Sequence, residues 1–225
     1  MAITTILCDL DGTLADSRED IAAAFQHAWQ SVFGGIPPSA AMIAQHIGKP
    51  IAEMIGELRG RLSPSLHSAF LTVYRQMYRR RNARLTRLYP GVILSLQALS
   101  AFRLGVVTTK ESEQAEMVLQ RLALLPFFQH IQGGTYKLRL KPAPDTIIAA
   151  LAALHCKPAH ALMVGDTPAD ILAGKEAGTM TCAVTYGFST RETLLQCAPD
   201  CVIDSFGQLP ELVRESGICG AEPAG

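Results

Sequence analysis

The stretch CDLDGTLADS, residues 8–17, places Asp9 and Asp11 directly after the apolar run 6–8 and next to Gly12. A short apolar run bounded by turn residues is typical of a buried strand. Two carboxylates at the end of such a strand repel one another unless a cation offsets their charge. The sequence therefore predicts a functional site where the first strand ends.

Similar apolar runs recur along the chain and alternate with helical patterns. Most are continuous rather than alternating, which indicates strands that helices cover on both faces. These features predict an α/β fold with a doubly wound, Rossmann-like parallel sheet. We expect its strands at residues 3–10, 104–108, 130–133, 161–165, 180–185 and 201–203.

One gap between the expected strands is unusually long. Residues 20–88 have helical patterns and no convincing strand, whereas a βαβ crossover needs far fewer residues. The sequence therefore predicts a helical insert at residues 17–88 and a catalytic core formed by residues 1–16 and 89–225. Pro90 and Gly91 would form the return hinge, with a helix beginning near Val92.

Composition narrows the functional class. Of 225 residues, 48% are hydrophobic and 18% charged, with a formal net charge of zero. The sequence has no apolar stretch near the ~20 residues that cross a bilayer and no signal-type N-terminus, so the default expectation is a cytoplasmic protein. The helical insert has ten Lys or Arg residues against four acidic ones. The rest of the chain therefore has an excess of acidic residues.

The cysteines indicate a reducing compartment. They are irregularly spaced and form no Cys-x-x-Cys motif, which favours free buried thiols over disulfides. A zinc site at Cys197 and Cys201 is a weaker alternative, since no second ligand pair with suitable spacing follows. The six are Cys8, Cys156, Cys182, Cys197, Cys201 and Cys219.

Polar residues also follow the other expected strands. Because the carboxyl ends of parallel strands share one edge of the sheet, these residues should meet Asp9 and Asp11 there. GDTPAD alone could be an ordinary helix start, but several carboxylates in one crevice require a hard cation, for which Mg²⁺ is the natural choice. The additional residues are Thr108, Thr109 and Lys110 after the second strand, Lys141 in a proline-framed loop, and Asp166 and Asp170 in GDTPAD.

Such a site suits phosphoryl transfer. Phosphoryl oxygens need a cation, an ammonium group and hydrogen-bond donors. A metal-bound aspartate can attack phosphorus and form an acyl phosphate. A second carboxylate can protonate the leaving oxygen and later activate water.

The motifs DLDGT, a Thr after the second strand, KPAPD and GDTPAD, in this order, closely resemble those of the haloacid dehalogenase superfamily of aspartyl-phosphate phosphatases. The resemblance extends from residue 3 to about residue 206. The helical insert resembles the C1-type cap of the phosphoglycolate phosphatase-like branch. This resemblance implies a Mg²⁺-dependent hydrolase of a small anionic phosphometabolite, with 2-phosphoglycolate as the first substrate to test.

The resemblance also implies roles for individual residues. Asp9 would be the nucleophile and a Mg²⁺ ligand, and Asp11 the general acid/base that gives its backbone carbonyl to the metal. Thr108 would donate a hydrogen bond to the phosphoryl group. Lys141 would stabilise the charge of nucleophile and phosphate.

The remaining motif residues would complete the metal and phosphate contacts. Asp166 would bind Mg²⁺, and Asp170 would orient metal-bound water. Gly12 and Thr13 lie in the turn whose backbone amides can face the phosphate. Thr109 is a departure, because the phosphatase branch commonly has Asn there, so a leaving-group contact by that amide is in doubt.

Within the insert, Lys49 in HIGKP is the candidate for substrate contact, because related proteins place a specificity loop there. A surface lysine after a helix-ending glycine is an equally good interpretation. His46 is expected to be structural or exposed. Asp16 and Ser17 resemble the hinge into the cap and are expected to act as helix-capping residues.

Several alternatives share these features. Sugar-phosphate phosphatases, nucleotidases, pyrophosphatases and β-phosphoglucomutase-like enzymes have the same core motifs, whereas phosphonoacetaldehyde hydrolases lack a counterpart of Asp11. A receiver-type phosphorylated switch has an acid cluster, a Thr and a Lys but no use for Asp11 or a cap. The zero net charge disfavours nucleic acid as a partner. We expect a small phosphorylated metabolite as partner, no membrane association, and a monomer or homodimer.

Overall fold

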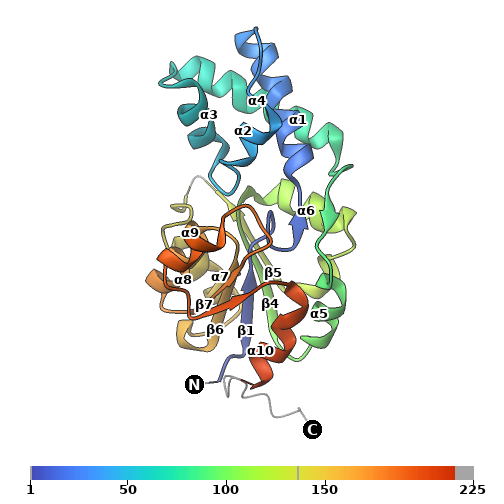
Figure 1. The fold of residues 1–225 in the computed structure, drawn as a ribbon, viewed down its shortest axis with the longest axis vertical. Coiled ribbons are helices and arrows are strands. Elements are labelled where there is room, and N and C mark those ends of the chain that lie inside the picture. The colour runs from blue at the N-terminus through green and yellow to red at the C-terminus, as the bar shows by residue number, and fades with distance from the viewer. Residues whose placement is uncertain (1, 136, 216–225) are drawn as a thin grey trace.

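The computed structural model describes residues 2–135 and 137–215 and contains a six-stranded parallel sheet (Figure 1). Its strand order is β5-β4-β1-β6-β7-β8. Burial on both faces explains the continuous apolar runs in the sequence. The strands are β1 (Thr5–Cys8), β4 (Arg103–Glu111), β5 (His130–Gly134), β6 (Ala161–Gly165), β7 (Met180–Val184) and β8 (Cys201–Ile203).

Helices cover both faces of this sheet (Figure 1). One face packs on α7 (Asp145–Ala153) and α8 (Pro168–Ala177), and α9 (Arg191–Gln196) contacts α8. The other lies against α6 (Ser112–Arg121), with α5 (Val92–Ala98) and α10 (Leu209–Glu215) beside it. Short 3₁₀ turns occur at Leu125–Phe127, Pro158–His160 and Phe206–Gln208.

Side-chain alternation along β1 builds a core on each face. Leu7 packs in one buried cluster with Ile147 of α7 and Met163 of β6. Its neighbours Ile6 and Cys8 belong to the larger cluster on the opposite face. Both clusters exclude water, so β1 has no solvent-facing side.

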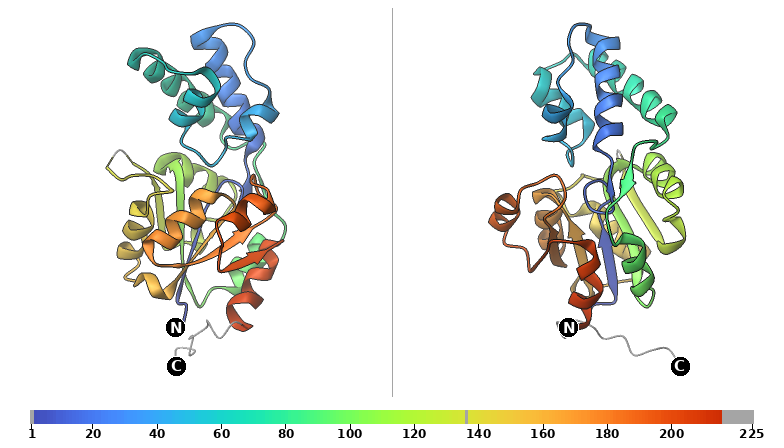
Figure 2. Two further views of the ribbon diagram at one scale, coloured as in Figure 1. Left: turned by 60° about the vertical axis from the view of Figure 1, so that its left-hand side comes forward. Right: turned by 45° about the vertical axis from the view of Figure 1, so that its right-hand side comes forward.

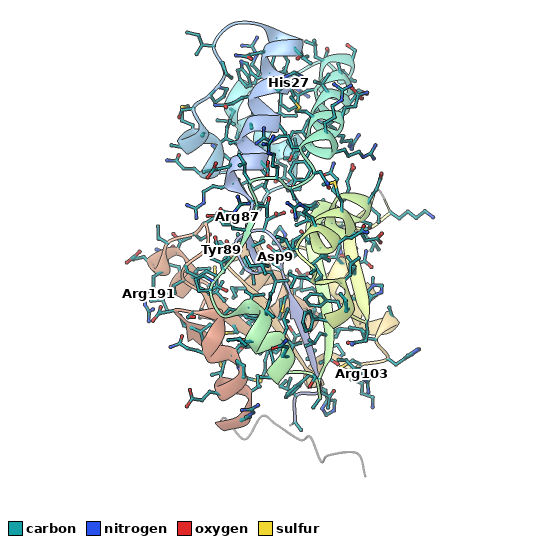
Figure 3. All side chains as sticks on the ribbon, turned by 90° about the vertical axis from the view of Figure 1, so that its right-hand side faces the viewer. Asp9, His27, Arg87, Tyr89, Arg103 and Arg191 are labelled. Carbon is teal, nitrogen blue, oxygen red and sulfur yellow. The ribbon has the colours of Figure 1, made fainter. Side chains whose placement is uncertain are left out.

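The strand order creates a crevice at the carboxyl end of β1. The chain passes from β1 to β4 and β5 on one side, then returns to β6 on the other side of β1. Open α/β sheets bind ligands at such a switch point. Figure 3 places Asp9 at the end of the sheet that faces the helical insert, whereas Arg103 lies at the opposite end.

The helical insert stands over that end of the sheet (Figures 1 and 2). Its packing is centred on α1 and α4, where Phe25, Trp29 and Phe33 meet Phe70 in a cluster of aromatic rings. The chain enters through β2 (Ala15–Asp16) and leaves through β3 (Arg87–Leu88), which pair antiparallel. The helices between these strands are α1 (Arg18–Phe33), α2 (Ala40–Ala44), α3 (Ile51–Arg59) and α4 (Pro64–Arg81).

The prediction of a strand-free segment over residues 20–88 is wrong at its end, because β3 occupies Arg87–Leu88. Two residues are too few to produce a recognisable periodicity, and this pairing is made with a distant segment. The expected strand 3–10 is shorter as well, since β1 ends at Cys8. The predicted helix start near Val92 is confirmed.

The described cysteines are free thiols, as predicted, but only Cys8 and Cys182 are fully buried. The other three, Cys156, Cys197 and Cys201, are half-buried, and Cys219 lies outside the described residues. Over the described ranges 2–135 and 137–215, no helix has the length and apolar character needed to cross a membrane.

Asp20 ties the two ends of the insert together. Its carboxylate is fully buried and accepts hydrogen bonds from the backbone amides of Leu85 and Thr86, each at 2.8 Å. The Thr86 hydroxyl and the Arg81 guanidinium also donate to it, at 2.9 and 2.8 Å. The start of α1 is thereby joined to the chain that follows α4.

We expect Asp20→Asn to lower the free energy of unfolding by about 2–4 kcal/mol, because an amide in this buried position leaves a donor and the Arg81 charge without an acceptor. Urea unfolding measures this change. The matched control is Asp16→Asn, since Asp16 and its ion-pair partner Arg18 are 38% and 44% exposed. That variant should differ from the wild type by less than about 1 kcal/mol, and equal losses in the two variants would contradict the role of Asp20.

Candidate active site

Three buried carboxylates meet at the carboxyl end of β1. Asp9 follows β1, and Asp166 and Asp170 flank the junction between β6 and α8. One oxygen of each lies within 4.8 Å of the others. Among residues 2–135 and 137–215 this is the only group of acidic, histidine or cysteine side chains close enough to hold a metal, and it contains neither Cys197 nor Cys201.

Lys141 is the buried cation of this group. Its ammonium lies 3.0 Å from Asp9 Oδ1 and 2.5 Å from Asp170 Oδ1. A hydrogen bond of 2.8 Å to the carbonyl oxygen of Val107, in β4, orients the ammonium further. One lysine therefore links the ends of three chain segments.

A single ammonium does not balance three carboxylates. Burial raises the pKa of Asp9 to about 7, and the charges of Asp170 and Asp11 add to this effect while Lys141 opposes it. Burial and the neighbouring carboxylates also raise the pKa of Asp166 well above its usual value. Burial disfavours the charged form of Lys141, but Asp170 and Asp9 outweigh it and raise the pKa of that ammonium. The group has an excess of negative charge.

Asp166 is held rigidly by its surroundings. Its two oxygens accept hydrogen bonds from the Thr13 hydroxyl, at 2.9 Å, and from the backbone amide of Phe188, at 2.8 Å. Gly12 and Gly187 leave the room for it, since a Cβ on either would collide with its side chain. Gly12 also has φ +91°, a conformation that favours glycine. The Thr13 side chain is thus engaged with Asp166.

Asp170 has two roles in this structure. Its Oδ2 accepts hydrogen bonds from the backbone amide and hydroxyl of Thr167, at 3.0 and 2.6 Å, in a capping box that begins α8. Its Oδ1 faces Lys141. The capping interpretation of GDTPAD is therefore correct for Asp170, which also belongs to the carboxylate group. Because the Lys141 ammonium already places a positive charge against Oδ1, Asp170 suits orientation of a ligand better than direct ligation of a cation.

The donor set fits a hard divalent cation. Asp9 Oδ1 is buried and accepts no well-aligned hydrogen bond, although Lys141 is nearby. Carboxylate oxygens with unused lone pairs are the ligands that Mg²⁺ prefers. A cation beside Asp9 and Asp166 would offset the excess negative charge that raises their pKa values.

The Asp11 side chain lies outside this carboxylate group. Its Oδ2 forms an ion pair of 2.9 Å with Lys110, and its Oδ1 accepts a hydrogen bond of 2.5 Å from the Ser17 hydroxyl. The buried Lys110 ammonium also donates to the Tyr78 hydroxyl, at 3.0 Å, and lies 4.3 Å from the centre of that ring. Tyr78 belongs to α4, so this network joins the insert to the core.

Three polar residues expected to contact substrate line a cavity between the insert and the core. Thr108 is buried within β4 and lines the cavity, as does Asp9. The predicted strand 104–108 is too short, because β4 continues to Glu111. Thr109 donates a hydrogen bond of 3.3 Å to the carbonyl oxygen of Gly48 in the insert. Lys49 lines the cavity but forms an ion pair of 2.6 Å with Glu57, which also contacts His46. The site thus combines buried acids, buried ammonium groups and hydroxyl donors beneath a helical cover.

The sequence pattern of haloacid dehalogenase-like hydrolases matches residues 6–184. The chain belongs to this family. Haloacid dehalogenase-like hydrolases of this kind have a six-stranded Rossmann-like core, and the structure described above shows that fold.

Relatives in this family are phosphatases. A pyrophosphatase of Anoxybacillus flavithermus is 33% identical, with 93% of this chain and 96% of the relative covered. A phosphoglycolate phosphatase of Vibrio vulnificus is also 33% identical, with 95% and 97% covered. The solved structure of a haloacid dehalogenase-like hydrolase from Streptococcus pneumoniae has a TM-score of 0.83 at 30% identity, with 93% and 98% covered. The chain is therefore a hydrolase of the phosphate-ester class.

Sequence reasoning missed the roles of three residues at this site. Lys110 was expected at this edge of the sheet, but its ion pair with Asp11 was not predicted, and Lys110 lies within β4 rather than after it. Ser17 precedes α1, yet its hydroxyl makes no capping bond with that helix and donates to Asp11 instead. Tyr78 occurs in a helical pattern far from the motifs, and only the packing of α4 on the core brings it to Lys110.

The raised pKa of Asp9 predicts how metal binding depends on pH. Between about pH 4 and 7 the folded protein retains a proton that the unfolded chain releases, so the stability of the metal-free protein falls as pH rises through this window. A divalent cation binds the ionised carboxylates and competes with protons.

Mg²⁺ should therefore raise the melting temperature more at pH 8 than at pH 5.5, as measured by calorimetry. Asp166→Asn should abolish the effect and Asp204→Asn, at an exposed carboxylate, should keep it; equal shifts at both pH values would contradict the prediction.

Proposed function

We propose that this chain is a Mg²⁺-dependent phosphomonoester hydrolase that acts on a small phosphorylated metabolite through an aspartyl-phosphate intermediate. The observation that supports this function is the buried group of Asp9, Asp166 and Asp170 around Lys141, at the carboxyl end of β1. Asp9 and Asp166 would hold the cation, with Asp170 and the backbone carbonyl of Asp11 completing the site. When bound, Mg²⁺ would neutralise the charge that develops on the phosphoryl oxygens.

Asp9 is the proposed nucleophile. One of its oxygens attacks phosphorus while the bond from phosphorus to the ester oxygen breaks, which leaves the phosphoryl group on Asp9. Lys141, 3.0 Å from Asp9 Oδ1, offsets negative charge on both the nucleophile and the phosphoryl group. The Thr108 hydroxyl and the backbone amide of Thr13 would donate to the phosphoryl oxygens. The Gly12 amide, which was expected to face the phosphate, instead donates a hydrogen bond of 2.9 Å to the carbonyl oxygen of Ala15.

Asp11 is the proposed general acid/base. In its acid form it donates a proton to the leaving oxygen as the ester bond breaks. In the second step, it takes a proton from the water that attacks the aspartyl phosphate, which releases phosphate and restores Asp9. The contacts from Lys110 and Ser17 hold this carboxyl beside the cavity and apart from the carboxylates around Lys141.

The substrate is proposed at the level of class. Phosphoglycolate and pyrophosphate, which appear in the names of relatives, are the first compounds to test. Sugar phosphates and nucleotides are the next compounds to test. Isomerisation of a sugar phosphate would indicate the β-phosphoglucomutase-like alternative. Lys49 is proposed as a substrate contact from the insert, which requires release from Glu57. The sequence-based expectations of a cytoplasmic monomer or homodimer remain predictions.

A generic phosphomonoester such as p-nitrophenyl phosphate should be hydrolysed over many turnovers with Mg²⁺. Chelation of the metal should reduce the rate to background, because the carboxylates then repel the phosphoryl group. Asp9→Asn should reduce kcat by about three orders of magnitude or more, since an amide is a poor nucleophile. Release of p-nitrophenol, followed by absorbance, measures both effects.

The control for this measurement is Asp204→Asn, which changes an exposed carboxylate on the core and should retain full activity. Full activity of Asp9→Asn would refute the nucleophile assignment. A single stoichiometric phosphorylation of the wild type, without release of phosphate, would instead support the switch alternative.

Lys110→Met should lower kcat about tenfold or more, because Asp11 loses the ammonium that positions it. The affinity for Mg²⁺ should stay near that of the wild type, because Lys110 lies outside the carboxylate group. Steady-state kinetics with a Mg²⁺ titration separates these quantities. Lys110→Arg should restore part of the rate, and the exposed control Lys175→Met should leave it unchanged. A loss of metal affinity with unchanged kcat would show that Lys110 does not position Asp11.

A further inference from the structure

The cavity between the insert and the core is larger than the proposed chemistry requires. It has a volume of about 860 Å³ and extends from Asp9 and Asp11 to α3, α4 and the loop before α7. Pockets of about 300–1,000 Å³ hold organic molecules of drug size. A phosphoryl group with a two-carbon acid would fill only a small part of this space.

The insert is already docked on the core at both sides of this cavity. On one side, the Gly48 carbonyl oxygen accepts the hydrogen bond from Thr109, and a Cβ on Gly48 would lie 2.7 Å from the Thr167 methyl group. On the other side, Lys110 reaches Tyr78, and Arg79 of α4 pairs with Glu113 of α6. The cavity is therefore bounded by contacts on two sides and stays open to solvent elsewhere, and its volume does not come from an insert that stands apart from the core.

The wall that the insert contributes is mainly apolar. Ile51 of α3 and Leu71 of α4 are half-buried and line the cavity. Behind them the wall is closed by side chains of the hydrophobic core. The other apolar lining residues are Ile21, Ile47, Pro50, Ala52, Met54 and Tyr74 from the insert, and Leu140 from the core.

The charged groups of the lining already have partners. Lys49 pairs with Glu57 at 2.6 Å, Arg79 pairs with Glu113, and Arg75 pairs with Glu111 at 2.5 Å. Lys110 pairs with Asp11. Lys137, an exposed residue, is the one lining Lys or Arg without an ion pair among the described residues. A second anionic group on the substrate would therefore compete with carboxylates of the protein for most of these cations.

We infer that the leaving group of the substrate is an extended organic group with an apolar face, which packs against Ile51 and Leu71 while the phosphoryl group lies at Asp9. This inference rests on the proposed function, because it assumes that phosphorus is held at Asp9. It assigns the apolar wall of the insert as the specificity subsite. Compact compounds with a second anionic group, such as phosphoglycolate and pyrophosphate, would be poorer substrates than an ester with a longer apolar group.

A series of primary alkyl phosphates (ethyl, butyl and hexyl) tests this inference with the intact enzyme and Mg²⁺. The leaving alcohols of this series have nearly the same acidity, so differences in kcat/KM report contacts of the chain. Burial of a methylene group corresponds to about a fourfold effect at most, so kcat/KM should rise about two- to fourfold for each added methylene. Phosphoglycolate and pyrophosphate should fall below hexyl phosphate.

Variants locate the subsite. Leu71→Asn and Ile51→Asn should flatten the dependence on chain length while ethyl phosphate keeps its kcat/KM within about threefold. Leu66→Asn is the matched control, because Leu66 lies on the same helix as Leu71, is 41% exposed and does not line the cavity. Leu71→Ala and Ile51→Ala provide the same test if an Asn variant does not fold.

Binding of the matching alkylphosphonates, measured by calorimetry, separates this inference from the proposed function. Affinity that rises with chain length in a protein that hydrolyses no ester would overturn the proposed hydrolase function and leave the apolar subsite supported. Turnover of all the esters with equal kcat/KM would overturn the subsite and leave the hydrolase function intact. A dependence on chain length that survives in Leu71→Asn and Ile51→Asn would also overturn the subsite.

Discussion

The burial of three carboxylates around one ammonium is the constraint on which the rest of this structure depends. Asp9, Asp166 and Asp170 repel one another in a medium that screens charge poorly, and Lys141 compensates only part of that repulsion. Burial is the largest of the causes that raise the pKa of Asp9 to about 7. The fold keeps these groups together because each follows a strand of the same parallel sheet or lies in a loop packed against it. Perturbed carboxylates of this kind cluster at functional sites, and the proposed binding of a cation would relieve their repulsion.

The helical insert completes the site through charge as well as shape. Lys110 is a buried cation of the core, but its surroundings come from both units, since Asp11 lies in the core and Tyr78 in α4. The cation is thus satisfied only when α4 lies against the core. Together with the hydrogen bond from Thr109 to Gly48, this contact holds the insert over the carboxylates, and the cavity in which a leaving group would lie is bounded by both units.

Local patterns were sufficient for the parallel sheet and for the order of the motifs. Strands β6 and β8 lie where apolar runs were expected. β6 is buried along its whole length, whereas β8 lies at the edge of the sheet and only Ile203 is fully buried. Strands β2 and β3 were not foreseeable, since each has two residues whose pairing is decided by the entry and exit of the insert. The role of Asp20 was not foreseeable either, because an acidic residue in the first turn of a helix usually interacts only with the helix dipole. Its buried partners come from residues 81–86.

The amino-acid sequence by itself determined the family, the fold class and which carboxylates and lysine stand at the ends of strands. It could do so because these properties depend on residue types at short spacings, such as Asp9 and Asp11 after one apolar run. The tertiary structure alone decided which charges pair. Asp11 turns from the carboxylate group to Lys110 and Ser17, Asp170 serves both α8 and Lys141, and an apolar wall faces the reactive end of the cavity. These contacts join residues far apart in the chain, and their geometry depends on how the insert packs on the sheet.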